Sequence, residues 1–216
     1  MTLDRLRPLA TRLLDPWVAA ADRLGLTPNG VSVLAFGTAI AAGASFALAG
    51  AGAEALSVPD LADPLWYAVG ATMVGINGWL DLLDGALARE QEVASDAGDL
   101  LDHVLDRYAD IVIVAGLAAG VGGATGYALG FAAVTGVVMT SYLGTQSQAV
   151  GLDRVYGGLV GRADRLAIIG LVGFASAAVP GAVAGGLGLV GWLLVFLAVV
   201  GHLTALQRFW GAWTRL

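Results

Sequence analysis

Residues 81–106 read DLLDGALAREQEVASDAGDLLDHVLD, and this stretch places four aspartates inside or beside strongly apolar sequence. The four are Asp81, Asp84, Asp102 and Asp106. An ionised carboxylate is costly in a membrane helix, so such a residue normally faces a cavity and serves a function. Asp81 and Asp84 are three positions apart, which places them on one face of a helix. Asp102 and Asp106, four positions apart, share a face in the same way. Two such helices joined by a short loop are predicted to form an acidic cluster that binds Mg²⁺ or Mn²⁺, which prefer oxygen ligands.

The composition of the whole chain indicates an integral membrane protein. Of its 216 residues, 57% are hydrophobic and 13% are charged, and the mean hydropathy is +0.78. A soluble domain carries about 25% charged residues. The sequence contains no cysteine, which excludes disulfides, thiolate metal ligands and cysteine nucleophiles. All eleven basic residues are arginine and the net charge is −6, so the basic surface expected of a nucleic-acid-binding protein is absent and no nucleic-acid partner is expected.

The pattern of apolar segments predicts the fold. Residues 1–24 mix leucine, tryptophan and alanine with arginine, which is typical of an amphipathic helix lying in the membrane interface. The alternative is a soluble N-terminal helix packed on the core. Six later segments each approach the roughly 20 residues that a membrane span needs. We place the spans at about 31–51, 65–87, 100–120, 125–149, 165–183 and 185–206. The expected fold is therefore all-α: a six-transmembrane-helix bundle with an N-terminal amphipathic interfacial helix, in one domain covering residues 1–216.

The distribution of arginine predicts the orientation of this bundle. Under the six-span arrangement every arginine falls on one side of the membrane, and the opposite loops near 52–64, 121–124 and 182–186 carry none. Cytoplasmic loops are enriched in basic residues. We therefore expect a protein of the cell membrane with both termini and the aspartates at the cytoplasmic face.

Small residues and an arginine beside the aspartates indicate the kind of ligand. Gly85 follows Asp84 directly, and Ala88 lies about one turn beyond it, so a bulky group can lie against this face of the helix. Arg89 is permanently charged and suited to grip phosphate with two hydrogen bonds. Divalent ions would shield the charge of a diphosphate and stabilise the attacking and leaving oxygens. At the edge of a bilayer, the expected substrate is a lipid-linked diphosphate.

The spacing of the whole stretch resembles the signature of the CDP-alcohol phosphatidyltransferase family, D-x₂-D-G-x₂-A-R-x₈-G-x₃-D-x₃-D. All eight fixed positions are present: Asp81, Asp84, Gly85, Ala88, Arg89, Gly98, Asp102 and Asp106. Thr27-Pro28-Asn29 also resembles the family's entry into its first span. The resemblance implies an enzyme in which the hydroxyl of a polar alcohol attacks the lipid-side phosphorus of a CDP-linked lipid, releasing CMP.

The resemblance also implies roles for single residues. Asp81, Asp84, Asp102 and Asp106 would bind two Mg²⁺ or Mn²⁺ ions, and Asp106 would accept the proton of the attacking hydroxyl. The residues expected to contact the CDP-lipid are Asn29, Asp81, Gly85, Ala88, Arg89 and Ser95. An alternative role for Ser95 is to cap the next helix. Family members are generally homodimers, so a homodimer is expected here.

A second segment bears on the acceptor. Residues 141–165 resemble the segment with which family members bind inositol phosphate, and they retain Ser141, Tyr142, Gly151, Arg162 and Arg165. They differ at Gly144, Gln146 and Gln148, where that segment has basic, basic and acidic residues. We predict that Arg154, Arg162 and Arg165 bind a phosphorylated acceptor. The ranking is glycerol phosphate first, inositol phosphate second, and serine or another unphosphorylated alcohol third. An alternative role for Arg154 is to contact lipid headgroups.

Three further points stay open. The acidic, lysine-free composition favours an archaeal lipid substrate, CDP-archaeol, with CDP-diacylglycerol as the alternative. From a different class of protein, the aspartates could be the permeation ligands of a divalent-cation channel or transporter. Their clustering near one membrane face and the charge of Arg89 oppose that reading. An inactive paralogue that serves only as a dimer partner is the remaining alternative.

Overall fold

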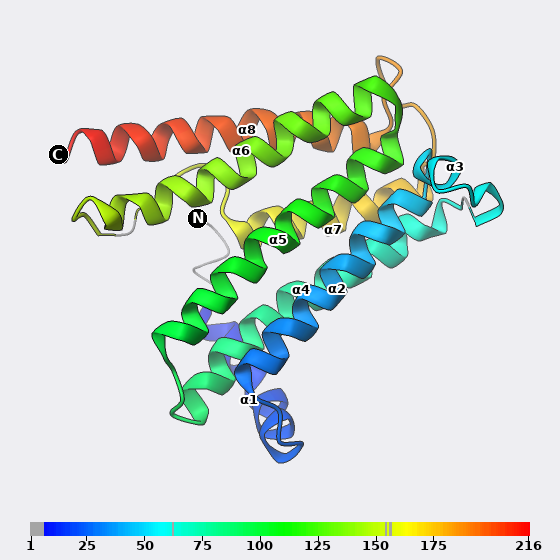
Figure 1. The fold of residues 1–216 in the computed structure, drawn as a ribbon. Coiled ribbons are helices and arrows are strands. Elements are labelled where there is room, and N and C mark those ends of the chain that lie inside the picture. Colours follow the sequence, from blue (N-terminus) through cyan, green and yellow to red (C-terminus); the bar gives the residue numbers. More distant parts are fainter. Residues whose placement is uncertain (1–6, 62, 154, 156) are drawn as a thin grey trace.

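The protein is helical throughout the part of the chain that the computed structural model describes, residues 7–61, 63–153, 155 and 157–216 (Figure 1). The helices are α1 (Arg7–Arg23), α2 (Pro28–Leu48), α3 (Gly52–Ala55), α4 (Leu65–Glu90), α5 (Asp96–Val121), α6 (Gly123–Ala149), α7 (Arg162–Ala178) and α8 (Leu189–Trp213), with a 3₁₀ turn η2 at Pro59–Leu61. Within these described ranges the one β-type pairing is an isolated bridge between Ala184 and Leu187. The all-α fold predicted from the sequence is confirmed.

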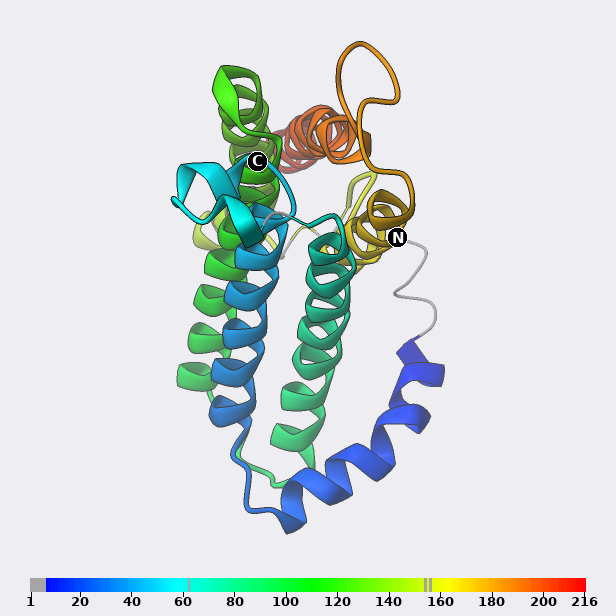
Figure 2. The same cartoon turned by 90° about the vertical axis from the view of Figure 1, so that its right-hand side faces the viewer.

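The long helices form two groups. Helices α2, α4 and α5 lie side by side, with α7 against α4, while α6 and α8 form a pair that diverges from them (Figure 1). Helix α1 crosses the end of α2 and α4 that is opposite α3 (Figure 2). The connection from α4 to α5 lies at the same end as α1, so the aspartate-rich stretch is found there.

Side-chain caps fix where the helices next to this stretch begin. Thr27 caps α2 by accepting a hydrogen bond from the Gly30 amide at 3.2 Å, and Pro28 occupies the first turn. Ser95 caps α5 in the same way, accepting from the Gly98 amide at 3.2 Å. The capping role considered for Ser95 is therefore present in the structure.

Close backbone contact brings α2 and α5 together. A Cβ atom added to Gly116 of α5 would overlap the carbonyl oxygen of Gly43 of α2. Phe46 and Leu117 are completely buried in the core beside this contact. Small residues let helices in a membrane approach closely, because association there depends on van der Waals packing. The register in which α5 presents its aspartates to α4 is thus set partly by glycines.

Three helices of the described chain, α2, α6 and α8, are long and apolar enough to cross a membrane. Helices α4 and α5 also have the necessary length, but the charged residues of the motif lie on them. Helix α7 has only 17 residues. The six-span count therefore stays a prediction.

Helix α1 forms within the segment predicted to be amphipathic. One face buries Leu14, Val18 and Ala21 in a cluster that includes Leu83 and Leu87 of α4. The helix also exposes other apolar side chains, Leu13 and Trp17, although the Trp17 and Trp79 rings meet in an edge-on arrangement with centroids 6.0 Å apart. The helix thus packs against α4, which fits both readings of this segment, and its place in the membrane interface stays a prediction.

The predicted boundaries need correction near the C-terminus. The segment predicted at 165–183 ends as α7 at Ala178, and the segment predicted at 185–206 begins later, at Leu189, and extends to Trp213. The intervening residues include Gly181, Gly185 and Gly186 with positive φ. Glycine adopts positive φ readily, but a residue with positive φ cannot continue a right-handed helix, so the chain turns here.

Candidate functional site

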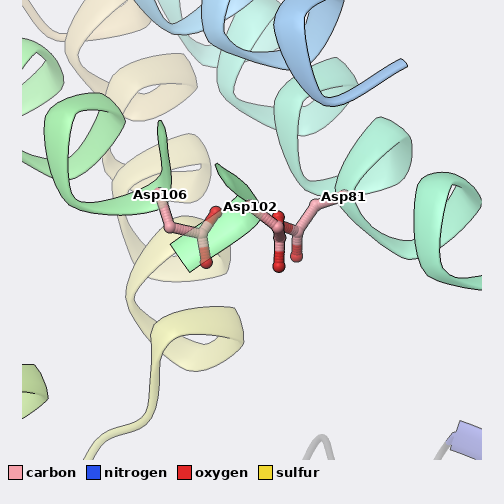
Figure 3. Close-up of side chains that lie close together, drawn as sticks. All are labelled: Asp81, Asp102 and Asp106. Carbon is pink, nitrogen blue, oxygen red and sulfur yellow. The ribbon is translucent and has the colours of Figure 1, made fainter. Parts of the chain in front are cut away.

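Three of the four predicted metal ligands come together between α4 and α5. Asp81 extends from α4, and Asp102 and Asp106 extend from successive turns of α5 (Figure 3). Each offers a carboxylate oxygen, and these oxygens lie within 4.8 Å of one another. Oxygen ligands about 2.1 Å from a Mg²⁺ ion lie up to about 4.2 Å apart across it, so small side-chain rotations would let one ion contact all three. We call these three residues the carboxylate cluster.

Asp84 lies outside the carboxylate cluster. Its Oδ2 atom accepts a hydrogen bond of 2.6 Å from the hydroxyl of Ser32 on α2, and only 6% of the residue is exposed. Ser32 also contacts the carbonyl of Pro28 at 3.1 Å, so this part of α2 holds the Asp84 carboxylate in place. The structure thus brings three of the four predicted ligands together, and the role of Asp84 as a metal ligand stays a prediction.

A cavity of about 450 Å³ lies beside Asp84. Its lining includes five of the residues predicted to contact the CDP-lipid: Asn29, Gly85, Ala88, Arg89 and Ser95. Asp84 and Asp102 also line it, so the carboxylate cluster borders the cavity through Asp102. We call this space the α2–α4–α5 cavity. The sixth predicted residue, Asp81, is not among its lining residues, and its contact with the CDP-lipid stays a prediction.

Asp81 instead lies at an apolar groove of about 510 Å³ between α4 and α7. Most of its lining is aliphatic, aromatic or glycine, including Leu82, Leu166 and Phe174, and its charged members are Asp81 and Arg162. We call it the α4–α7 groove. Because Asp81 belongs to the groove and Asp102 to the α2–α4–α5 cavity, the carboxylate cluster connects the two spaces.

Two arginines at the start of α7 pair with aspartates, and one of them, Arg162, reaches the other side of the cluster. The guanidinium of Arg162 lies 2.6 Å from Asp81 Oδ1 and 2.7 Å from Asp106 Oδ1. Arg165 is buried and donates a hydrogen bond of 2.7 Å to Asp110. Such charge-assisted contacts are short and offset the cost of burying charge. The third predicted acceptor residue, Arg154, lies outside the described residues.

Four polar residues near the cluster were not assigned a place in the site by the sequence reasoning. Asp110 binds Arg165 and lies 3.7 Å from Arg107. Arg107 also lies 3.3 Å from Asp106. The series 102, 106 and 110 continues at four-residue spacing, a signal that could have identified Asp110.

The other two missed residues, Asn77 and Ser32, are buried polar groups in the apolar helices α4 and α2. Asn77 donates to the carbonyl of Ala35 at 2.8 Å and accepts from Arg162 at 3.5 Å. A polar residue in an apolar helix usually hydrogen-bonds a specific partner. The presence of Asn77 and Ser32 in apolar sequence is therefore the signal that could have identified them.

Comparisons with known proteins agree with this arrangement. The model of the family described as CDP-alcohol phosphatidyltransferase matches residues 25–204. Archaetidylinositol phosphate synthase of Methanothermobacter thermautotrophicus is 30% identical over 99% of this chain and 95% of its own. Phosphatidylinositol phosphate synthase of Streptomyces avermitilis is 33% identical over 81% of this chain and 69% of its own. The crystal structure of Mycobacterium tuberculosis phosphatidylinositol phosphate synthase with CDP-DAG bound has a TM-score of 0.74 at 25% identity, covering 94% of each chain.

Proposed function

Because the chain belongs to the CDP-alcohol phosphatidyltransferase family, we propose that it transfers the lipid-phosphate group of a CDP-linked lipid to inositol phosphate and releases CMP. The family resemblance read from the sequence motif is confirmed by the match over residues 25–204. The protein is therefore a membrane transferase of phospholipid biosynthesis. The observation that carries the specific proposal is the carboxylate cluster bordered by the α2–α4–α5 cavity, the α4–α7 groove and Arg162.

The acceptor differs from the one ranked first on sequence alone. The relatives described above are named as inositol phosphate lipid synthases, and glycerol phosphate appears in none of their names. Inositol phosphate, ranked second because Gly144 and Gln146 replace basic residues, therefore becomes the proposed acceptor. Arg162 and Arg165 supply guanidinium groups suited to grip its phosphate.

The charged residues divide the chemistry between them. Asp81, Asp102 and Asp106 would hold a divalent ion, Mg²⁺ or Mn²⁺, and Asp84 would join in holding a second one. When bound, such ions shield the diphosphate and stabilise the leaving phosphate of CMP. Asp106 acts as the base: the acceptor hydroxyl loses its proton to this carboxylate as its oxygen bonds to the lipid-side phosphorus and the bond from phosphorus to CMP breaks. Arg162, 2.7 Å from Asp106, would hold the acceptor phosphate so that a hydroxyl lies near the base.

The two spaces suit the two parts of the CDP-linked lipid. In the α2–α4–α5 cavity, Arg89 would bind a phosphate and the small residues Gly85 and Ala88 leave room for the nucleotide. The α4–α7 groove has an apolar lining suited to a hydrocarbon chain, and its charged end lies at Asp81. The lipid is proposed to be CDP-archaeol or CDP-diacylglycerol.

A reconstituted assay tests the proposal. Purified protein in liposomes is given CDP-archaeol or CDP-diacylglycerol together with Mg²⁺ or Mn²⁺. Inositol phosphate, glycerol phosphate and serine are then tested separately as acceptors. The proposal expects CMP release together with a lipid product carrying the mass of inositol phosphate. A lipid product that carries glycerol phosphate or serine instead would overturn the assignment of inositol phosphate as the acceptor. Divalent-cation flux without CMP release would instead favour the channel alternative.

We also propose that the protein is a homodimer of the cell membrane with its site at the cytoplasmic face. The orientation is supported by the one-sided distribution of arginine in the sequence. A membrane-impermeant reagent applied to sealed vesicles of known orientation tests it: a cysteine introduced at the exposed Glu92 should react from the cytoplasmic side. Reaction from the other side alone would contradict the orientation. Crosslinking in the same vesicles tests the dimer.

A further inference from the structure

The loop between α6 and α7 is held to neighbouring helices by several hydrogen bonds. The amide of Val155 donates to the carbonyl of Gly144 and to the hydroxyl of Ser147, each at 3.3 Å. Ser147 in turn donates to the carbonyl of Asp153 at 3.1 Å. The same loop leads directly into α7, whose first residue is Arg162. The way the loop is anchored therefore affects where α7 begins.

One guanidinium, that of Arg208, links this loop to two helices. Arg208 lies on α8 and donates from Nε to the carbonyl of Gly157 in the loop at 2.8 Å. Its Nη1 atom donates to the carbonyl of Thr140 on α6 at 2.7 Å. Hydrogen bonds from a charged donor are stronger than neutral ones, and this side chain has two of them to backbone carbonyls. Arg208 therefore fixes the positions of α6, α8 and the loop relative to one another.

The burial of Arg208 distinguishes it from an arginine that only orients the protein in the membrane. Such an arginine extends its head group toward water or lipid phosphate. Arg208 is only 8% exposed and directs its guanidinium inward. A Cβ atom on Gly144 would lie 2.8 Å from Nη1, so glycine leaves the space that the guanidinium needs. Gly158 also packs its backbone against Thr204 of α8 with a φ of +127°.

We propose that Arg208 is a positioning residue that sets the affinity for the acceptor. By fixing the loop through Gly157, it determines where Arg162 and Arg165 lie at the start of α7. The proposal rests on the proposed function, in which these two arginines bind the acceptor phosphate. The predicted nucleotide contacts lie on other elements, α2, α4 and α5, so binding of the CDP-lipid depends much less on Arg208.

Steady-state kinetics of the full-length protein tests this separation. Arg208→Gln should raise the KM for inositol phosphate about tenfold, the loss expected for one charge-assisted hydrogen bond. The KM for CDP-lipid and kcat should stay within about twofold, because positioning of the acceptor alone is affected. Arg208→Lys should recover part of the loss, and Gln207→Ala, an exposed neighbour on α8, is the control. An unchanged acceptor KM, or equal changes in both KM values, would overturn the proposal.

Gly144→Ala provides a second variant in case Arg208→Gln does not fold. The added methyl group would displace the guanidinium from the side of α6, so the acceptor KM should rise in the same direction. An acceptor KM unchanged in a folded Gly144→Ala protein would also count against the proposal.

Hydrogen exchange gives a readout that does not depend on catalysis. The amide of Val155 should exchange faster in Arg208→Gln than in the parent or in Gln207→Ala. If the parent shows no transfer but this exchange depends on Arg208, the proposed function is wrong and anchoring of the loop is supported. If the parent is active and the exchange is the same in all three proteins, the role of Arg208 is wrong.

Discussion

Arg162→Gln removes the guanidinium that contacts both Asp81 and Asp106. The ion-pair distances are 2.6 and 2.7 Å, and the three side chains are between 15% and 28% exposed. Breaking a buried pair costs about 3–5 kcal/mol, and partial exposure places this case near the lower end. The variant should therefore unfold at a lower temperature than the parent. Added Mg²⁺ should restore more stability to the variant than to the parent, because a divalent cation neutralises the same carboxylates.

The kinetic effect of Arg162→Gln follows from its proposed contact with the acceptor. Two charge-assisted hydrogen bonds to a phosphate together contribute about 3 kcal/mol, which corresponds to an increase of about 100-fold in the KM for inositol phosphate. The assay is CMP release at a series of inositol phosphate concentrations. Arg162→Lys keeps the charge but lacks the planar guanidinium, so its KM for inositol phosphate should lie between those of the parent and of Arg162→Gln. Arg215→Gln, an exposed arginine near the end of the chain, is the control. An Arg162→Gln protein with the parent's acceptor KM would refute the reasoning.

Three other substitutions test separate parts of the site and fold. Asp106→Asn should lower kcat by about 1000-fold, the middle of the range for loss of a general base, while binding of labelled CDP-lipid persists; parental activity would remove the base assignment. Ser32→Ala deprives the buried Asp84 of a charge-assisted hydrogen bond and should lower stability by about 1.5–3 kcal/mol, measured by denaturation. An unchanged midpoint would contradict this. Gly116→Leu should prevent α5 from approaching α2 and lower the thermal midpoint, whereas Gly37→Leu, where a Cβ meets no described atom within 4 Å, should not. Equal midpoints would contradict the packing argument.

Local sequence carried the information that predicted the helices and most of the carboxylate cluster. The spacing of Asp102 and Asp106 puts both on one face of α5, and this holds in the structure. Thr27 and Ser95 act as caps at the positions where cap residues precede apolar sequence. The turn predicted near 182–186 is longer in the structure, from Ala178 to Leu189, because the residues around it are apolar enough to resemble the ends of the two spans.

Contacts between distant segments could not be predicted in the same way. Ser32 and Asp84 are 52 positions apart, and Asp110 and Arg165 are 55 apart. No local periodicity relates such pairs, so the displacement of Asp84 from the cluster depends on how α2 packs against α4.

The proposed acceptor differs from the one ranked first on the sequence, and a contact between distant segments bears on that difference too. Position 144 was judged by its own side chain, whereas the structure brings the guanidinium of Arg208 from α8 against Gly144. The charge near this part of α6 therefore comes from a residue far away in the sequence. A local comparison of the acceptor segment could not include it.

Binding of Mn²⁺ to the carboxylate cluster tests the central claim most directly. The ion is titrated into purified protein in the presence of CDP, and bound Mn²⁺ is followed by its electron paramagnetic resonance signal. The parent should bind Mn²⁺ with saturation, and Asp102→Asn, which alters a residue shared by the cluster and the α2–α4–α5 cavity, should lose most of this binding. Equal saturable binding by the parent and by a folded Asp81→Asn/Asp102→Asn protein would contradict the account.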